Sequence, residues 1–443
     1  MPYILNTKQQ RQEMLDFLGL TMDELFADVP ADLLVKTLDI PEARSELLIT
    51  QQLSKLAHKN QSNLTCFMGG GFYDHFIPAA VNAMLSRGEF YTAYTPYQPE
   101  LSQGTLQAIY EFQSMICRIT DMECSNASIY DGGTALYEAM MMAMRITKRG
   151  KIILDDSVNP IYRVMLESYT RNLNIELVTI KNEDGRANRA AIEAELDDQT
   201  AAVIVQNPNF FGLIDDFTDI VEMVHAKKAL VISSVYPVSL GLIKTPGDMG
   251  VDIVTGEGQS LGITLSFGGP YLGFMATSLK YVRNLPGRIC GRTLDTEGRD
   301  GFVLTLQARE QHIRRAKANS NICSNESLCA LAATIYMSMI GKKGFKELAM
   351  NCYDKASYAF ERICAIPGVQ PRFHNRWFFN EFVVELPRNA ADVAAELISR
   401  GFAAGFPLFR YYEGMDNTMM IAVTEKRTKA EIGMLAEALE SVL

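Results

Sequence analysis

Histidine, cysteine and tryptophan are scarce in this sequence, and their scarcity limits its chemistry. Its 443 residues include five histidines, eight cysteines and one tryptophan. No two cysteines form a Cys-x-x-Cys pair, so the sequence predicts neither a disulfide scaffold nor a zinc knuckle. We expect reduced thiols and no metal site.

The sequence also lacks long hydrophobic runs and an excess of positive charge. The apolar stretch 139–144 ends at Arg145, far short of the ~18 residues that cross a membrane. The 42 basic residues are outnumbered by 52 acidic ones, whereas nucleic-acid-binding proteins usually carry a basic face. The first residues do not have the pattern of a signal peptide. We therefore expect a cytoplasmic protein that binds neither membranes nor nucleic acid.

The hydrophobic pattern divides the chain into three parts. Residues 1–65, which include Leu33 and Leu38, have apolar side chains at helical spacing and predict a helical N-terminal segment. Residues 66–325 alternate between apolar runs and amphipathic segments, which predicts a large α/β domain. Residues 326–443 begin with a long helical stretch and continue as a smaller α+β domain.

Five β-rich runs in the large domain predict a mainly parallel sheet. Continuous apolar runs separated by helical segments are typical of strands that are buried on both faces. A sixth run, 269–277, follows too closely for a crossover helix, so we expect it to be antiparallel. The five runs are 151–154, 175–180, 202–206, 229–233 and 252–255. In the small domain, strands are expected at 379–386 and 417–424, and helices at 390–400 and 429–443.

A turn at residues 128–135 leads directly into a helical run. Free backbone N–H groups at Gly132, Gly133 and Thr134 would suit a phosphate at the positive end of the helix dipole. The same pattern also fits an ordinary cap made by Asp131 and Thr134. The sequence leaves both interpretations open.

Three other segments attract attention. Residues 256–262 contain three glycines, but their spacing is too wide for a dinucleotide fingerprint and no helix follows. Residues 66–104 are rich in glycine and aromatic residues, with little regular periodicity, and predict an irregular stretch that forms either a surface loop or a pocket wall. Residues 309–317 place four cations on a helical stretch, either as a solvated face or as an anion site.

Taken together, five segments resemble the glycine cleavage system P-protein family, and specifically its N-terminal half made as a separate subunit. These segments are 70–78, 91–104, 126–135, 267–274 and 309–323. The resemblance implies the fold of the pyridoxal phosphate (PLP)-dependent transferases, fold type I, as in aspartate aminotransferase. It also implies decarboxylation of glycine and transfer of the aminomethyl group to the lipoyl arm of H-protein.

The two residues that this chemistry requires are missing where the resemblance places them. A lysine must hold the cofactor, and a carboxylate must keep its pyridine nitrogen protonated. The strand 229–233 leads to Ser233 and Ser234, and no lysine lies between Lys244 and Lys280. The resemblance therefore implies that PLP is bound by a homologous beta subunit, in an alpha2beta2 assembly with active sites at the interface.

The resemblance also assigns residues of this chain to that shared site. Tyr97 would be a hydrogen-bond donor and packing surface in the partner's glycine pocket, and Glu100 would orient polar groups or the amino group. Weaker candidates are Ser102, Gln103, His75 and Tyr73, and the turn of Gly132, Gly133 and Thr134 would be a relic of a phosphate site. Two alternatives remain: a complete PLP enzyme with an unrecognised lysine, and a non-catalytic scaffold subunit.

Overall fold

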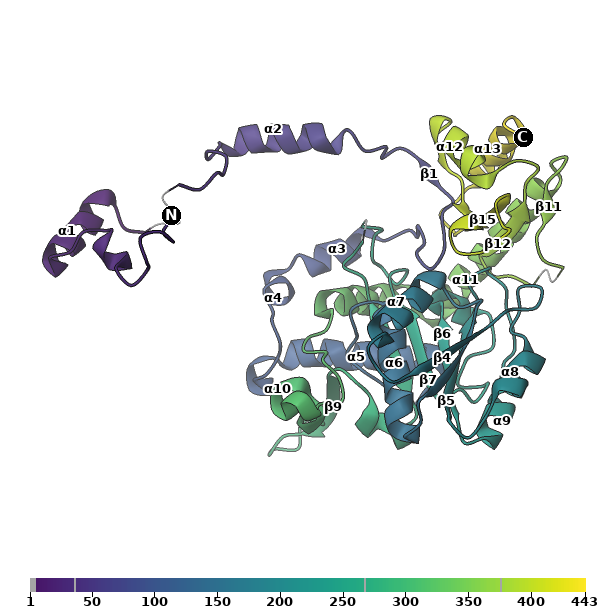
Figure 1. Ribbon diagram of the computed structural model, residues 1–443, viewed down its shortest axis with the longest axis horizontal. Coiled ribbons are helices and arrows are strands. Elements are labelled where there is room, and N and C mark those ends of the chain that lie inside the picture. Colours follow the sequence, from purple (N-terminus) through teal and green to yellow (C-terminus); the bar gives the residue numbers. More distant parts are fainter. Residues whose placement is uncertain (1–4, 36, 267, 375–376) are drawn as a thin grey trace. The chain divides into compact units, whose positions relative to one another are not determined.

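The structure is a computed structural model that describes residues 5–35, 37–266, 268–374 and 377–443. By its contacts the chain divides into two compact units, Met1–Ser62 and Asn63–Leu443 (Figure 1). The expected boundary between residues 325 and 326 stays a prediction. Phe267, the first residue of one segment that carries the family resemblance, lies outside the described residues.

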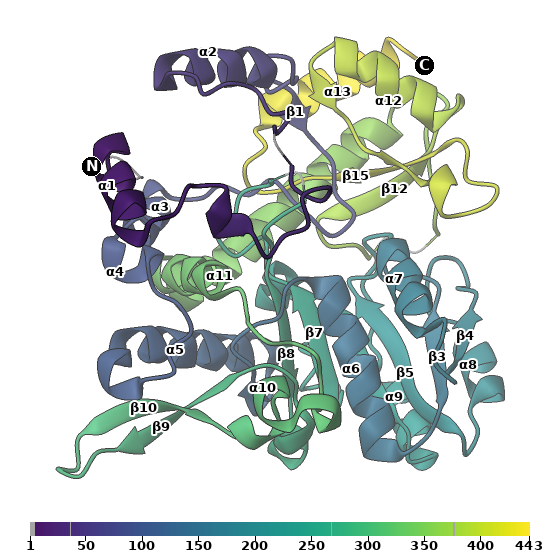
Figure 2. The same ribbon diagram turned by 60° about the vertical axis from the view of Figure 1, so that its left-hand side comes forward.

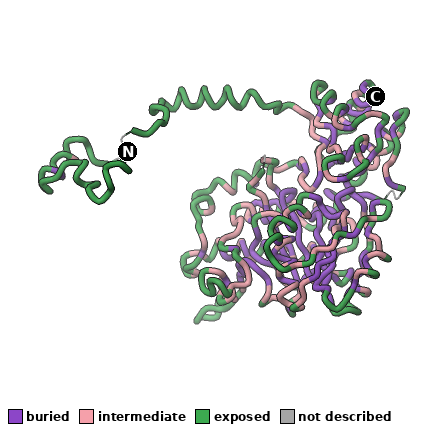
Figure 3. Tube along the Cα trace, viewed as in Figure 1, coloured by how far each residue is buried: buried purple, intermediate pink, exposed green. Residues whose placement is uncertain are grey.

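The first unit contains two helices, α1 (Lys8–Leu18) and α2 (Glu46–Ala57), and a 3-10 turn (Glu24–Phe26). The helical spacing around Leu33 and Leu38 is misleading, because the described residues from 31 to 45 lie outside helices. Pro41 contributes to this outcome, since it lacks an N–H group and restricts the residue before it. Leu15 is the only buried residue among the described residues of this unit, and Figure 3 draws most of the unit as exposed.

A seven-stranded sheet with the order β2-β8-β7-β6-β5-β3-β4 organises the second unit. The five expected strands, β3 to β7, are parallel, and β8 is antiparallel to β7, as the short connection predicted. The strands are β2 (Cys124–Ser125), β3 (Lys151–Asp155), β4 (Glu176–Ile180), β5 (Thr200–Asn207), β6 (Leu230–Val235), β7 (Ile253–Glu257) and β8 (Gly273–Thr277).

Helices cover both faces of this sheet (Figure 2). Alternate residues of a strand enter different cores: Ile152 and Leu154 pack in the core that includes α6 and α7, whereas Ile153 packs in the core that includes α5, α9 and α11. The doubly wound arrangement expected from the apolar runs is confirmed. The helices are α5 (Gln103–Thr120), α6 (Gly132–Thr147), α7 (Pro160–Thr170), α8 (Arg189–Glu195), α9 (Thr218–Ala226) and α11 (Ser327–Cys364).

The C-terminal part contains a four-stranded antiparallel sheet with the order β11-β12-β15-β14. The long helix α11 leads into it and is interrupted at Gly341, where φ is 61° and ψ is 179°. The expected strands and helices of this part are present. They are β11 (Gln370–Pro371), β12 (Glu381–Glu385), β14 (Phe406–Pro407), β15 (Thr418–Ala422), α12 (Ala390–Ser399) and α13 (Lys429–Glu440).

Three segments differ from expectation. Residues 66–104 are not wholly irregular, because they contain α3 (Ala79–Leu85), α4 (Gly88–Tyr91) and a 3-10 turn (Pro99–Leu101). The helix expected at 309–317 is divided into short pieces, since Arg315 adopts a φ of 52° that ends α10 (Gln311–Arg314). A hairpin of β9 (Ile289–Leu294) and β10 (Asp300–Thr305) was not expected. Among the described residues no helix is long and apolar enough to span a membrane.

Candidate functional site

A small cavity lies at the carboxyl ends of β5, β6 and β7, where ligands bind in open α/β sheets. We call it the sheet-end cavity. Its lining includes Ser234 from β6, Glu257 from β7, and the rings of Tyr73 and Tyr162. Its volume is about 30 Å³, far below the ~300–1,000 Å³ of typical ligand pockets.

The residues at the two positions that the chemistry requires are buried. Ser233 and Ser234 lie on β6, with 2% and 3% of their surface exposed. The carboxamide of Gln259, in the region where the lysine was expected, accepts from the Tyr73 N–H at 2.9 Å and donates to the Tyr73 carbonyl at 3.1 Å. It also donates to the Ile263 carbonyl at 2.8 Å. Gln259 therefore holds the main chain at Tyr73 against the residues that follow β7.

The lysines nearest in sequence do not reach this cavity. Lys244 forms an exposed ion pair with Asp216 at 3.1 Å. Lys280 lies over the ring of Tyr281, with Nζ 4.7 Å from the ring centroid. Among the described residues that line the sheet-end cavity there is no lysine.

The turn at the N-terminus of α6 already holds two carboxylates of this chain. The side chain of Asp131 caps the helix and accepts from the Thr134 N–H at 2.9 Å. The Gly132 N–H donates to Glu257 Oε2 at 2.9 Å. A Cβ on Gly132 would lie 2.5 Å from the Tyr162 hydroxyl oxygen, so that ring covers the turn closely. Carboxylates occupy the positive end of this helix where a phosphate would sit.

Glu257 is a buried carboxyl group, and its surroundings act on its ionisation in opposite directions. Burial raises the pKa of Glu257 to about 7, while hydrogen bonds from three backbone N–H groups oppose the shift. These donors are Leu272 at 3.0 Å, Gly132 at 2.9 Å and Gln259 at 2.9 Å. Glu257 thus joins α6, β7 and β8.

The raised pKa of Glu257 makes the stability of the chain depend on pH. An acid whose pKa rises on folding from an ordinary value of 4.5 to about 7 stabilises the folded state at low pH, and this contribution is lost as pH rises through about 7. From about pH 5 to pH 8 the loss is about 2 kcal/mol. Glu257→Gln resembles the protonated form and should lack this dependence.

Urea unfolding of both proteins at the two pH values measures this effect. The free energy of unfolding of the unsubstituted chain, minus that of the variant, should decrease by about 2 kcal/mol at the higher pH. A difference that does not change with pH would contradict the assignment to Glu257.

Tyr73 and His75, two of the weaker candidates, are both buried in hydrogen-bonded networks. The Tyr73 hydroxyl donates to Glu381 at 2.8 Å, and burial raises the pKa of Glu381 to about 7. His75 Nδ1 lies 2.6 Å from Glu425, and its Nε2 is hydrogen-bonded to the Tyr236 hydroxyl. These contacts connect residues 70–76 to the C-terminal part.

Tyr97 lies on the surface of this chain, with 51% of its area exposed. Its hydroxyl oxygen accepts from Arg288 Nη2 at 3.3 Å, and the guanidinium carbon lies 5.6 Å from the ring centroid. The ring of His312 approaches its edge, with centroids 6.0 Å apart. Arg288 and His312 therefore hold the Tyr97 side chain in place, and about half of its surface stays exposed.

Of the other candidates in this segment, Glu100 lies on the surface and Gln103 supports a neighbouring hairpin. Glu100 is exposed on the 3-10 turn, whereas Ser102 lies at the start of α5. The Gln103 carboxamide accepts from the Phe302 N–H at 2.9 Å and donates to the Phe302 carbonyl at 2.9 Å. Gln103 thus attaches the hairpin of β9 and β10 to α5.

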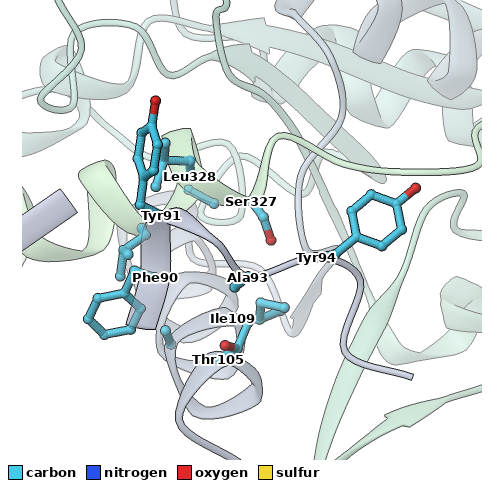
Figure 4. A pocket seen from close by; sticks show the side chains of 11 residues that line it. Phe90, Tyr91, Ala93, Tyr94, Thr105, Ile109, Ser327 and Leu328 are labelled. Atoms are coloured by element: carbon cyan, nitrogen blue, oxygen red, sulfur yellow. The ribbon is translucent and has the colours of Figure 1, made fainter. Parts of the chain in front are cut away.

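The surface around this segment is aromatic. A shallow pocket of about 70 Å³ lies between α4, α5 and the start of α11, and Figure 4 shows Phe90 and Tyr91 pointing in opposite directions at its side. Tyr91 is 70% exposed and Tyr94 is 83% exposed. An exposed apolar patch of this kind is typical of a protein interface.

Sequence reasoning missed three residues of these networks. Arg288, Glu257 and Glu381 are buried ionisable side chains whose partners lie far away in sequence. Residues 256–262 drew notice only for their glycines, so no role was assigned to Glu257. The cationic segment 309–317 also has a different use, because Arg309 Nη2 donates to the Gly287 carbonyl at 2.7 Å and supports the main chain beside Arg288.

A mainly parallel sheet covered by helices, followed by an antiparallel C-terminal part, is the architecture of fold type I, the PLP-dependent transferases. The structure of this chain is similar in fold to that of the Burkholderia pseudomallei sphingosine-1-phosphate lyase, with a TM-score of 0.67 and 13% identity over 92% of each chain. The family model for the glycine cleavage system P-protein matches residues 1–439. The chain belongs to the glycine cleavage system P-protein family.

Relatives at high identity match this chain from end to end. A probable glycine dehydrogenase (decarboxylating) subunit 1 from Maridesulfovibrio salexigens is 54% identical, and one from Geotalea uraniireducens is 55% identical, each over 100% of both chains. A crystal structure of glycine decarboxylase (P-protein) of the glycine cleavage system, in inhibitor-bound form, has 42% identity and a TM-score of 0.93, with 100% of both chains covered.

PLP, the cofactor implied by the fold, does not fit the sheet-end cavity of this chain. The cavity is too small, Glu257 uses the Gly132 N–H at the phosphate turn, and Gln259 replaces the lysine. Ser234 cannot supply the negative charge that a pyridinium nitrogen requires. The interpretation of the turn as a relic of a phosphate site stays a prediction, and in this structure its Gly132 N–H already donates to Glu257.

Proposed function

We propose that this chain is the first subunit of a two-subunit glycine decarboxylase of the glycine cleavage system. A homologous second subunit would carry PLP, which supplies an electron sink when bound. The pair would release CO2 from glycine and pass the aminomethyl group to the lipoyl arm of H-protein. The observation that carries this proposal is 54% identity over the full length to a subunit 1 relative, and the small sheet-end cavity, with no lysine among its described lining residues, supports it.

Exposed apolar surface supports a partner subunit. On α2, Leu47, Leu53 and Leu56 are each at least half exposed, at 66%, 59% and 50%. In the second unit, Tyr94 and Leu101 are exposed at 83% and 79%. Large apolar areas on a protein surface favour burial in a complex. We propose that both surfaces face the second subunit in an alpha2beta2 assembly, in the cytoplasm.

In this assembly the residues of this chain would shape and close a pocket of the partner. Tyr97 would present its ring and hydroxyl to the bound glycine, and Glu100 would place a carboxylate near the amino group. Such groups act by orienting the substrate and by stabilising charge in a site from which water is excluded.

Borohydride reduction tests where the cofactor is bound. Each subunit, alone and combined, is loaded with PLP, reduced and digested, and pyridoxyl-lysine peptides are identified by mass spectrometry. The proposal expects the adduct on the second subunit only, and labelled-bicarbonate exchange only when both subunits are present. An adduct on Lys244 or Lys280, together with exchange by this chain alone, would favour a complete enzyme and contradict the proposal.

A further inference from the structure

Arg288 is a buried cation next to the exposed ring of Tyr97. It immediately precedes β9, and only 3% of its surface is exposed. Its carbonyl accepts from the Ala127 N–H at 2.8 Å, and Arg309 supports the preceding peptide at Gly287. The main chain at Arg288 is therefore fixed on both sides.

The guanidinium group of Arg288 has only neutral acceptors among the described residues. Nη1 donates to Asn325 Oδ1 at 3.2 Å and to Ser324 Oγ at 3.4 Å, and Nη2 donates to the Tyr97 hydroxyl at 3.3 Å. Within the described parts of the chain its buried Nε has no hydrogen-bond partner, and the three acceptors of its other two nitrogens are uncharged. A buried charge without a counterion is costly, so a negative group from outside this chain would complete the site.

The hydrogen bond from Arg288 also determines whether the Tyr97 hydroxyl oxygen accepts or its proton donates in this contact. A guanidinium has donors and no acceptor, so the Tyr97 oxygen must accept from it. The hydroxyl proton is then directed to another group. Because Tyr97 is half exposed, that group can come from a molecule bound to this surface.

We propose that Arg288 is a positioning residue that holds the Tyr97 hydroxyl as a donor to an oxyanion in the partner's site. The oxyanion is the carboxylate of glycine or the phosphate of the cofactor, and the positive charge of Arg288 favours either. This inference rests on the proposed function, because it requires Tyr97 to face the second subunit's pocket.

A double-mutant cycle in the assembled enzyme tests this inference. This chain, the PLP-loaded partner subunit and lipoylated H-protein are combined, and glycine-dependent exchange of labelled bicarbonate is measured. Tyr97→Phe should lower kcat/KM about 100-fold, as expected for the loss of one hydrogen bond to a charged group, and Arg288→Gln about 10-fold. The double variant should lie within about twofold of Tyr97→Phe alone, because Arg288 acts through that hydroxyl.

Two further variants separate positioning from folding. Arg288→Lys keeps a cation and a donor, so it should retain most of the activity that Arg288→Gln loses. Arg292→Gln is the matched control: this arginine lies on β9 in an exposed ion pair with Asp300 at 2.6 Å and should leave exchange unchanged. If Arg288→Gln fails to fold, the cycle is run with Arg288→Met, which fills a similar space and also removes the cation and its donors. Losses that multiply in the double variant would overturn the inference.

Binding measurements identify the oxyanion. If it is the carboxylate, Tyr97→Phe and Arg288→Gln raise the KM for glycine; if it is the phosphate, they raise the PLP concentration that half-reconstitutes the cofactor-free complex. A loss confined to kcat would overturn the oxyanion assignment. Full activity of Tyr97→Phe would overturn the proposed role of Tyr97, whereas an impaired Tyr97→Phe with a normal Arg288→Gln would overturn this inference alone.

Discussion

Replacing Glu100 with glutamine in this chain should lower the glycine-dependent exchange of the assembled enzyme about 100-fold. Glu100 lies on the 3-10 turn that follows Tyr97, and it is exposed in the isolated chain. In the proposed assembly the partner subunit covers this turn, so the carboxylate acts in a medium where charge interactions are strong. Glutamine keeps the shape and removes the charge. The loss should be comparable to that seen when one charge-stabilising group is removed from an active site.

The control for Glu100→Gln is Glu111→Gln. Glu111 is exposed on the neighbouring helix α5, where its carboxylate accepts from Gln107 at 2.8 Å. This substitution changes the net charge equally and should leave exchange within about twofold. Sedimentation of the two subunits together shows whether assembly is intact. Equal exchange by both variants would favour a scaffold subunit and would contradict a role for Glu100 in the site.

The mainly parallel sheet could be predicted because its signals are local. Strand runs such as 151–154 and 202–206 are continuous apolar segments with helical segments between them, which indicates burial on both faces. The hairpin of β9 and β10 could not be found in this way, because β10 has no buried residue and β9 has only two. Its position depends on Gln103, which is distant in sequence.

The closed state of the sheet-end cavity could be predicted only in part. The absence of the lysine and of the carboxylate can be read from the sequence once the family resemblance gives their positions. The group that replaces the phosphate is not visible, since Glu257 and Gly132 are 125 residues apart. Local patterns contain no information about which side chain from β7 enters the turn before α6. Arg288 was missed for the same reason, because its contact with Tyr97 spans 191 residues.

Replacing Gly212 with alanine should have the largest effect on stability. Gly212 has a φ of +81°, and a Cβ there would lie 1.9 Å from the carbonyl oxygen of Glu381. This contact is with the main chain, so no change of rotamer can relieve it. The Gly212 carbonyl also accepts from the Phe379 N–H at 3.1 Å, which fixes the loop after β5 against the start of β12. We expect a loss of more than about 4 kcal/mol, or failure to fold.

Gly414→Ala separates steric overlap from backbone strain. Gly414 has a similar φ of +75°, but among the described residues no atom beyond Gly414 and its two chain neighbours lies within 4 Å of the position that a Cβ would take there. Its substitution should cost only about 1 kcal/mol, the ordinary penalty for a non-glycine residue in this conformation. Urea unfolding of the two variants measures the difference. If both lose the same free energy, the close approach of Gly212 to Glu381 does not determine stability, and the connection between the loop after β5 and β12 is more adaptable than these distances imply.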